Sequence, residues 1–284
     1  SPDPAMLAHI DRPLRGLSAW LAHFRAAPIP VLDATAAAIG ELALNEDAVD
    51  AHLLSETVAA DPLMTLKLLA HVGSNSRRDT DVETVVGALV LLGIGPFFRL
   101  FGALPTIGQA LHVTPETAQA RSGLRAVLDR SHRAARFAIA FAAHRMDPDA
   151  AVIHEAALLH DFAELLLWCH APKLALEIAR HQAADPTLRS SLAQRAVLGI
   201  ELADLQQSLM KAWRLPELLV RLGNDEAQGH HPQVQCVRLA VRVARHSAQG
   251  WDNAALPDDV RDVGALLQLG VEPAARLLHE LDEA

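Results

Sequence analysis

The chain has 284 residues, of which 51% are hydrophobic and 21% charged, so it can form one large folded domain or two fused lobes. Its formal net charge is −9, because 34 Asp and Glu outnumber 25 Lys and Arg. This balance provides no broad cationic surface for phosphate backbones, which excludes nucleic acid as the main partner.

Cysteine usage and hydropathy predict a cytoplasmic protein. Cys169 and Cys236 form no CxxC pattern, so we expect two buried thiols rather than a zinc site or a disulfide. No apolar run reaches the roughly 18 to 20 residues that span a bilayer, and no secretory leader precedes the first helix, so no membrane contact is expected. Residues 1–5, before Met6, resemble a vector-derived segment that contributes nothing to the fold.

The predicted fold is all-α, with about a dozen helices. Ala and Leu dominate, only 4% of residues are aromatic and Tyr is absent, so typical strand formers are scarce. Gly73, Gly93 and Gly199 fall after or within apolar periodic runs and are expected as stop signals. At four predicted helix starts a capping residue precedes a proline suited to the first helical position; these are Asp61-Pro62, Thr114-Pro115, Asp147-Pro148 and Asp185-Pro186.

Two of the predicted helices carry histidines that could meet. A long central helix carries His132, and its apolar spacing places this side chain on the inward face. The residues expected on that inward face are Leu128, His132, Ala135, Ile139 and Ala142. The next helix, predicted from about residue 148 to 169, has His160-Asp161 in its middle.

His132, His160 and Asp161 could form a metal site, or they could be ordinary polar residues of the core. Two imidazoles and a carboxylate could hold a divalent ion, which would acidify a bound water for phosphoester hydrolysis. The chain has 15 histidines, however, so accidental His-Asp neighbours are common, and an inward histidine is usually a hydrogen-bonded core residue.

Several segments together resemble the HDOD domain, the HD-related output domain of bacterial signalling proteins. The resemblance runs from about residue 29 to 248 and implies an all-helical fold related to HD-domain phosphohydrolases, with an N-terminal helical lobe on an HD-like bundle. The segments that carry it are Ile29-Pro30-Val31-Leu32, residues 61–69 and 82–93, Ser131-His132, residues 157–161, Val197-Leu198-Gly199 and Trp213-Arg214-Leu215-Pro216.

The departures from the HD pattern argue against catalysis. The resemblance implies a late Asp ligand where this chain has Arg245, and a fixed cation there opposes metal binding. The Gly and Lys that commonly follow the His-Asp pair are Ala163 and Glu164, and Glu would repel a substrate phosphate. Many relatives carry a His at Leu202 and a small residue at Gln206, and leucine cannot ligate a metal.

Two further signatures of relatives are missing. His230-His231 lie too close to Ala244 to match the His-His pair of relatives, and Asn224-Asp225 stand at that spacing instead. The Gly-Tyr-Pro signature of HD-GYP cyclic di-GMP phosphodiesterases is absent, since the chain has no Tyr, and this excludes that activity. The Asn usual before Ser in the N-terminal lobe is Gly73, which puts any function of that Asn in doubt here.

Arginines and tryptophans outside these motifs are expected to be structural. The arginines of the central helix predict a solvated face, with an anionic partner surface as the alternative. The tryptophans predict core anchors, with Trp251 as the most plausible ligand platform. The two sets are Arg121, Arg125, Arg130, Arg133 and Arg136, and Trp20, Trp168, Trp213 and Trp251.

The sequence therefore predicts a non-catalytic bacterial regulatory module that works through contacts with signalling proteins. We expect an N-terminal extension (1–28), an N-terminal lobe (29–110) and an HD-like lobe (111–284), with no cofactor. His132, His160 and Asp161 would be the remnant of a metal site. Two alternatives stay open: a metal-dependent phosphohydrolase of nucleotides that adds a carboxylate such as Asp225, and a nucleotide sensor that binds without turnover.

Overall fold

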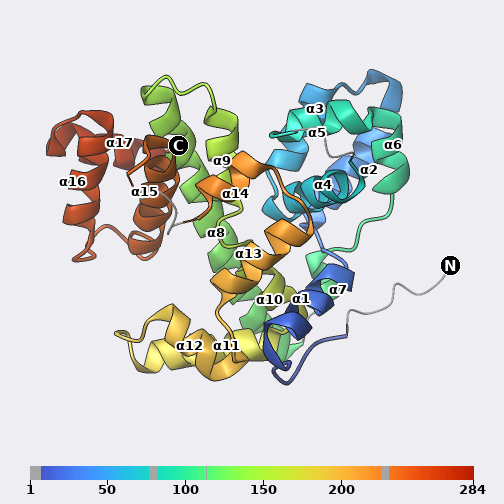
Figure 1. The fold of residues 1–284 in the computed structure, drawn as a ribbon, viewed down its shortest axis with the longest axis horizontal. Coiled ribbons are helices and arrows are strands. Elements are labelled where there is room, and N and C mark those ends of the chain that lie inside the picture. The colour runs from blue at the N-terminus through green and yellow to red at the C-terminus, as the bar shows by residue number, and fades with distance from the viewer. Residues whose placement is uncertain (1–7, 77–81, 113, 225–229) are drawn as a thin grey trace. The chain divides into compact units, whose positions relative to one another are not determined.

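The computed structural model describes residues 8–76, 82–112, 114–224 and 230–284, and in these ranges the protein consists of helices and the turns and loops that connect them (Figure 1). In these ranges the single β pairing is an isolated bridge between Val31 and Thr106. The expected all-α class is confirmed. None of the helices in these ranges is both long and apolar enough to cross a bilayer.

Residue contacts divide the chain into two compact units, each made of two segments. Unit 1 comprises Ser1–Val127 and Asp161–Leu215, and unit 2 comprises Leu128–His160 and Pro216–Ala284. The division passes through the long helix α8 (Pro115–His144). The expected lobe boundaries at residues 28 and 110 stay predictions.

Helices α3 and α10 each contact several other helices of unit 1, and α4 contacts both. Helix α3 packs against α2, α4 and α5, and α5 against α6. Helix α10 packs against α4, α7, α11 and α13, and α1 against α13. Besides the first part of α8, the elements are α1 (Gly16–Ala26), α2 (Asp33–Ala43), η1 (Glu46–Ala48), α3 (Ala51–Ala59), α4 (Pro62–Asn75), α5 (Val85–Leu92), α6 (Ile94–Leu100), α7 (Ile107–Ala110), α10 (Phe162–His170), α11 (Pro172–Ala184), α12 (Ser190–Leu198) and α13 (Leu202–Ala212).

Unit 2 is built around α15, which packs against α9, α14 and α16. Helix α17 packs against α16, and α14 packs against α9. With the second part of α8, the elements are α9 (Ala150–Leu158), α14 (Glu217–Leu222), α15 (Pro232–His246), α16 (Leu256–Leu267) and α17 (Val271–Glu283).

Two of the four predicted helix starts are confirmed. Helix α4 begins at Pro62 and α8 at Pro115, as the capping residues predict. Helix α9 begins at Ala150, two residues later than expected. The prediction at Asp185 is wrong: Asp185 ends α11 and accepts a hydrogen bond from the Thr187 N–H at 2.9 Å, so it opens a turn.

The expected inward face of α8 is correct except at Ile139. Leu128, Ala135 and Ala142 are buried, whereas the Ile139 side chain is 41% exposed. Phe137 is fully buried, and Ile139 stands two positions later, about 200° round the helix. The bulky aromatic ring therefore determines which side of α8 faces the core.

Most of the expected core anchors are buried. Trp20, Trp168 and Trp213 are at most 8% exposed, as predicted, and both cysteines are buried free thiols. Trp251 is half-buried, and its ring lies tilted against the His279 ring, with 4.3 Å between centroids. These contacts make Trp251 part of the packing between the end of α15 and α17.

Gly73 is not a stop signal but a close contact inside α4. A Cβ at this position would overlap the backbone carbonyl oxygens of Trp213 and Arg214, which cannot swing aside as a flexible side chain would. We expect Gly73→Ala to lower the free energy of unfolding by about 2 kcal/mol. The same change at Gly40, exposed on α2 with open space around it, should raise stability by up to about 1 kcal/mol, since Ala favours helices. Urea unfolding of both variants tests this, and equal effects would contradict it.

Candidate functional site

The His-Asp pair lies in a turn, not in the middle of a helix. The predicted helix over residues 148–169 is wrong, because α9 ends at Leu158 and α10 begins at Phe162. Leu159, His160 and Asp161 form the turn between them. Asp161 is the N-cap residue of α10 and its carbonyl oxygen accepts from Leu165 N–H at 3.2 Å, so the backbone of the pair starts a new helix.

A third histidine, which the sequence did not single out, lies near His132. Burial lowers the pKa of His154 on α9, and the charge of His132 on α8 lowers it further. Both residues belong to unit 2 and both are half-buried. His154 stands among the buried apolar residues of α9, so in the sequence it looks like one more core position and nothing marks it as functional.

The described residues do not complete the metal site of an HD enzyme. In the four ranges that the structure covers, no three His, Cys, Asp or Glu side chains form a group that could hold a metal ion. Asp225, the carboxylate of the enzymatic alternative, lies outside these ranges. Leu202 is only 7% exposed and offers no donor atom. The convergence of His132, His160 and Asp161 on a remnant metal site stays a prediction.

The start of α10 is occupied by a side chain of the protein itself. The backbone N–H of Ala163 donates to Gln206 Oε1 on α13 at 3.1 Å, and both residues are buried. Free N–H groups at a helix N-terminus commonly bind phosphate. Gln206 therefore accepts the Ala163 N–H, which could otherwise bind an anionic substrate next to the His-Asp pair.

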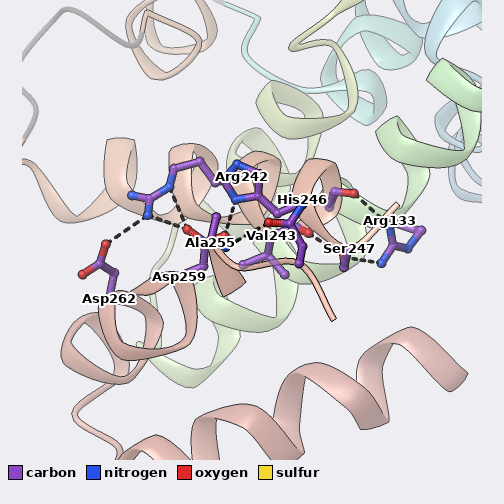
Figure 2. A network of polar contacts seen from close by, with 10 residues as sticks. Arg133, Arg242, Val243, His246, Ser247, Ala255, Asp259 and Asp262 are labelled. Atoms are coloured by element: carbon purple, nitrogen blue, oxygen red, sulfur yellow. Dashed lines mark hydrogen bonds and ion pairs between the residues drawn. The ribbon is translucent and has the colours of Figure 1, made fainter. Parts of the chain in front are cut away.

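Arg133 does not belong to a solvated face, which corrects the expectation for the arginine stripe. Its side chain is 15% exposed and bridges to α17, with Nε at 2.7 Å and Nη2 at 3.1 Å from the two Asp282 oxygens. It also donates to the Ala244 carbonyl at 2.9 Å and to Ser247 Oγ at 2.6 Å (Figure 2). Arg136 is exposed, as expected, whereas Arg121 is half-buried and its Nε donates to the Leu111 carbonyl oxygen at 2.7 Å.

A second cluster joins α15 to α16. Arg242 and His246, one turn apart on α15, both contact the fully buried Asp259 (Figure 2). Arg242 donates to Oδ1 from Nη2 at 2.5 Å and from Nε at 3.1 Å, and His246 Nδ1 lies 2.5 Å from Oδ2. The available sequence signal was this i, i+4 pair followed by an acidic helix start. Arg245, between them, is exposed.

Comparison with known families decides what the chain is. The model of the HDOD domain matches residues 29–228, which is more than half of the chain. The chain belongs to the HDOD family. The matched segment of this HDOD protein ends before α15, so Arg245 and the α15–α16 cluster lie beyond it.

Solved structures share the fold at low sequence identity. The response regulator MmoQ from Methylococcus capsulatus is 21% identical, with a TM-score of 0.66, over 89% of this chain and 98% of that one. A virulence factor from Campylobacter jejuni is 16% identical, with a TM-score of 0.62, over 92% of each chain. An HDOD domain protein of unknown function from Geobacter sulfurreducens is 14% identical, with a TM-score of 0.50, over 94% of this chain and 96% of that one. A search of curated proteins finds no match.

A buried histidine group in unit 1 of this HDOD protein lies apart from the His-Asp turn. His170, at the end of α10, is fully buried and its Nε2 lies 3.0 Å from the Pro28 carbonyl oxygen. Its ring meets that of His23 on α1 edge to face, with 5.4 Å between centroids. Burial, with smaller contributions from His23 and His9, lowers the pKa of His170 to about 4.

This group should make stability fall as the pH falls. His170 is neutral in the fold below pH 6.5, whereas the unfolded chain binds a proton there, so each pH unit down to the folded pKa favours unfolding. Between pH 6.5 and 5 the loss should be about 2 kcal/mol from this residue. His170→Gln, which keeps an N–H for Pro28, should flatten the pH dependence in urea titrations, and the same change at exposed His52 should not. An unchanged slope in His170→Gln would show that His170 is not its source.

Proposed function

We propose that this HDOD protein is a non-catalytic signal-transduction module that acts through contacts with other proteins. The observation that carries the proposal is the hydrogen bond from Ala163 N–H to Gln206 Oε1 at the start of α10. This hydrogen bond occupies the Ala163 N–H, which in an HD hydrolase could bind the phosphoester substrate. Glu164 in the same first turn adds a negative charge that disfavours phosphate.

The names of proteins with the same fold support a signalling role. MmoQ, which shares the fold, is named a response regulator. Regulation through protein contacts needs no metal and no turnover, which agrees with the buried Leu202 in place of a ligand. Two of the positions that differ from the enzymes, Leu202 and Gln206, are buried within the protein.

Capture followed by reconstitution tests the contact role. We expect tagged full-length chain to retain a signalling protein from its native bacterium, and the two purified proteins to form a stoichiometric complex. The complex should persist in EDTA and with His160→Ala, because neither metal nor the His-Asp turn contributes to the contact. A complex that forms only with added metal or nucleotide would instead support a ligand-dependent sensor.

The enzymatic alternative has one observation in its favour. The charge of His132 contributes to lowering the pKa of His154, and both histidines belong to unit 2. If this group served a phosphohydrolase, purified protein would retain a divalent metal, and His132→Ala would remove it. Elemental analysis of the two proteins, expected to show no bound metal in either, separates the alternatives.

A further inference from the structure

Helix α5 is apolar on all sides yet covered on only one. Its eight residues are Val, Val, Gly, Ala, Leu, Val, Leu and Leu, and a helix without a polar face is normally enclosed by protein. Val85, Ala88 and Leu89 are buried, and α5 as a whole packs against α3 and α4 (Figure 1). Val90 is nevertheless 68% exposed and Leu91 47% exposed.

Other exposed apolar side chains lie near α5 in the chain, at the end of α2 and on α3 and α6. Five of the nine large hydrophobic residues that are exposed in the described ranges fall between residues 44 and 100. Helix α3 packs against α5, and α6 follows α5 directly. We call this set the α5 surface: Leu44, Leu53, Val90, Leu91 and Leu100.

The α5 surface has an acidic border. The chain contains no Lys or Arg between Arg25 and Lys67, and exposed acidic side chains stand on α2, η1 and α3 in that interval. The Asp50 carboxylate accepts the Leu53 N–H at 2.8 Å, which puts a negative charge beside one of the surface leucines. The exposed acidic residues of this interval are Asp33, Glu41, Glu46, Asp47, Asp50 and Glu56.

One arginine offsets this charge only in part. Glu46 Oε1 lies 3.0 Å, and Arg99 Nη1 3.2 Å, from where a Cβ on Gly95 would be, so the two opposite charges lie at the start of α6. The remaining acids have no cationic side chain from their own segment. A second copy of this chain would bring the same acidic border against this one, which disfavours self-association through the α5 surface.

We propose that the α5 surface binds an amphipathic segment of a partner protein that carries apolar residues flanked by Lys and Arg. The apolar residues would cover Val90 and Leu91, and the basic residues would meet the acidic border. This inference rests on the proposed function, since it names where the protein contact is made and the chemistry of the partner.

A synthetic peptide provides the test with the full-length protein. The probe is a labelled 18-residue helix of Leu and Lys, compared in fluorescence anisotropy with a Leu and Glu peptide and a Lys and Ala peptide. We expect only the Leu and Lys peptide to bind, more weakly as salt rises. Val90→Thr with Leu91→Gln should weaken binding at least tenfold, since the apolar contact is lost without adding charge.

A matched variant separates the α5 surface from general stickiness. Val271→Thr with Leu192→Gln makes the same changes at exposed residues on α17 and α12 and should leave binding within twofold. Asp47→Asn with Glu56→Gln should reduce the salt dependence. Circular dichroism and thermal unfolding check that every variant folds.

Three outcomes would overturn the inference. The first is equal peptide binding by the α5 variant and the matched variant. The second is binding of phosphatidylcholine vesicles that depends on Val90 and Leu91, which would make the occupant a lipid surface. The third is a dimer that the α5 variant dissociates. None of them measures catalysis, so the proposed function can stand if the α5 surface fails, and metal-dependent turnover would remove the proposed function whatever the peptides show.

Discussion

Replacing Asp61 by alanine should lower the free energy of unfolding by about 4 kcal/mol. Asp61 is fully buried, caps α4 by accepting the N–H groups of Leu63 at 2.8 Å and Met64 at 3.2 Å, and accepts Leu32 N–H at 2.9 Å. Alanine would remove the cap and leave buried donors without acceptors. Burial raises the pKa of Asp61, and these hydrogen bonds oppose the rise, so the carboxylate depends on all of its donors.

Two comparisons isolate the cause. Asp61→Asn keeps one acceptor oxygen and should lose about half as much stability as Asp61→Ala. Asp50→Ala removes the exposed cap of α3 and should cost only about 1 kcal/mol, because water can replace it. Chemical unfolding of the three variants gives the values, and a loss at Asp61 no larger than at Asp50 would show that its second role, holding Leu32, is unimportant.

Arg133→Met should destabilise the protein by about 3 kcal/mol, because it removes the two-point ion pair of the partly buried Asp282, which keeps only the hydrogen bond from Trp251 Nε1. Burial tends to raise the pKa of Asp282, but the hydrogen bonds and charge of Arg133 outweigh it and hold the pKa below its ordinary value. Losing Arg133 also frees the Ala244 carbonyl and Ser247 Oγ. The same change at exposed Arg125 on α8 should stay within about 0.5 kcal/mol.

A double-mutant cycle distinguishes this ion pair from simple packing. If Arg133 acts through Asp282, the variant with both Arg133→Met and Asp282→Asn should be more stable than the sum of the two single losses predicts. Strict additivity would contradict the bridge between α8 and α17. Because Asp282 has a lowered pKa, its contribution should be present near neutral pH and fade as the pH falls through that pKa.

The fold class could be predicted from sequence because helix propensity and capping are local. Asp61-Pro62 shows this: the cap and the first helical proline lie side by side in the chain, and the helix begins there. The break between α9 and α10 could not be predicted in this way. Its apolar spacing continues through His160-Asp161, while the backbone leaves the helix at Leu159 and restarts at Phe162.

The site was harder to predict than the fold because its contacts join residues far apart in the sequence. In the sequence, Gln206 stands out only because many relatives carry a small residue at its position. In the structure, its Oε1 accepts a hydrogen bond from Ala163 N–H on another helix. Arg133 looked like one member of a solvated stripe, yet its partner Asp282 lies almost 150 residues away. A side chain's periodicity gives its face but not its partner, so polar pairs of this kind emerge only from the packed structure.

The most direct test of the non-catalytic assignment is a hydrolysis assay of the purified full-length chain. Cyclic dinucleotides and nucleoside phosphates would be incubated with Mn²⁺, Mg²⁺ or Fe²⁺, and product compared with that from His160→Ala. We expect no product above the His160→Ala background with any of the metals, because the family resemblance places Leu202, Glu164 and Arg245 where HD enzymes carry groups for metal-assisted hydrolysis. Metal-dependent turnover that His160→Ala abolishes would contradict the assignment and make the protein an HDOD enzyme.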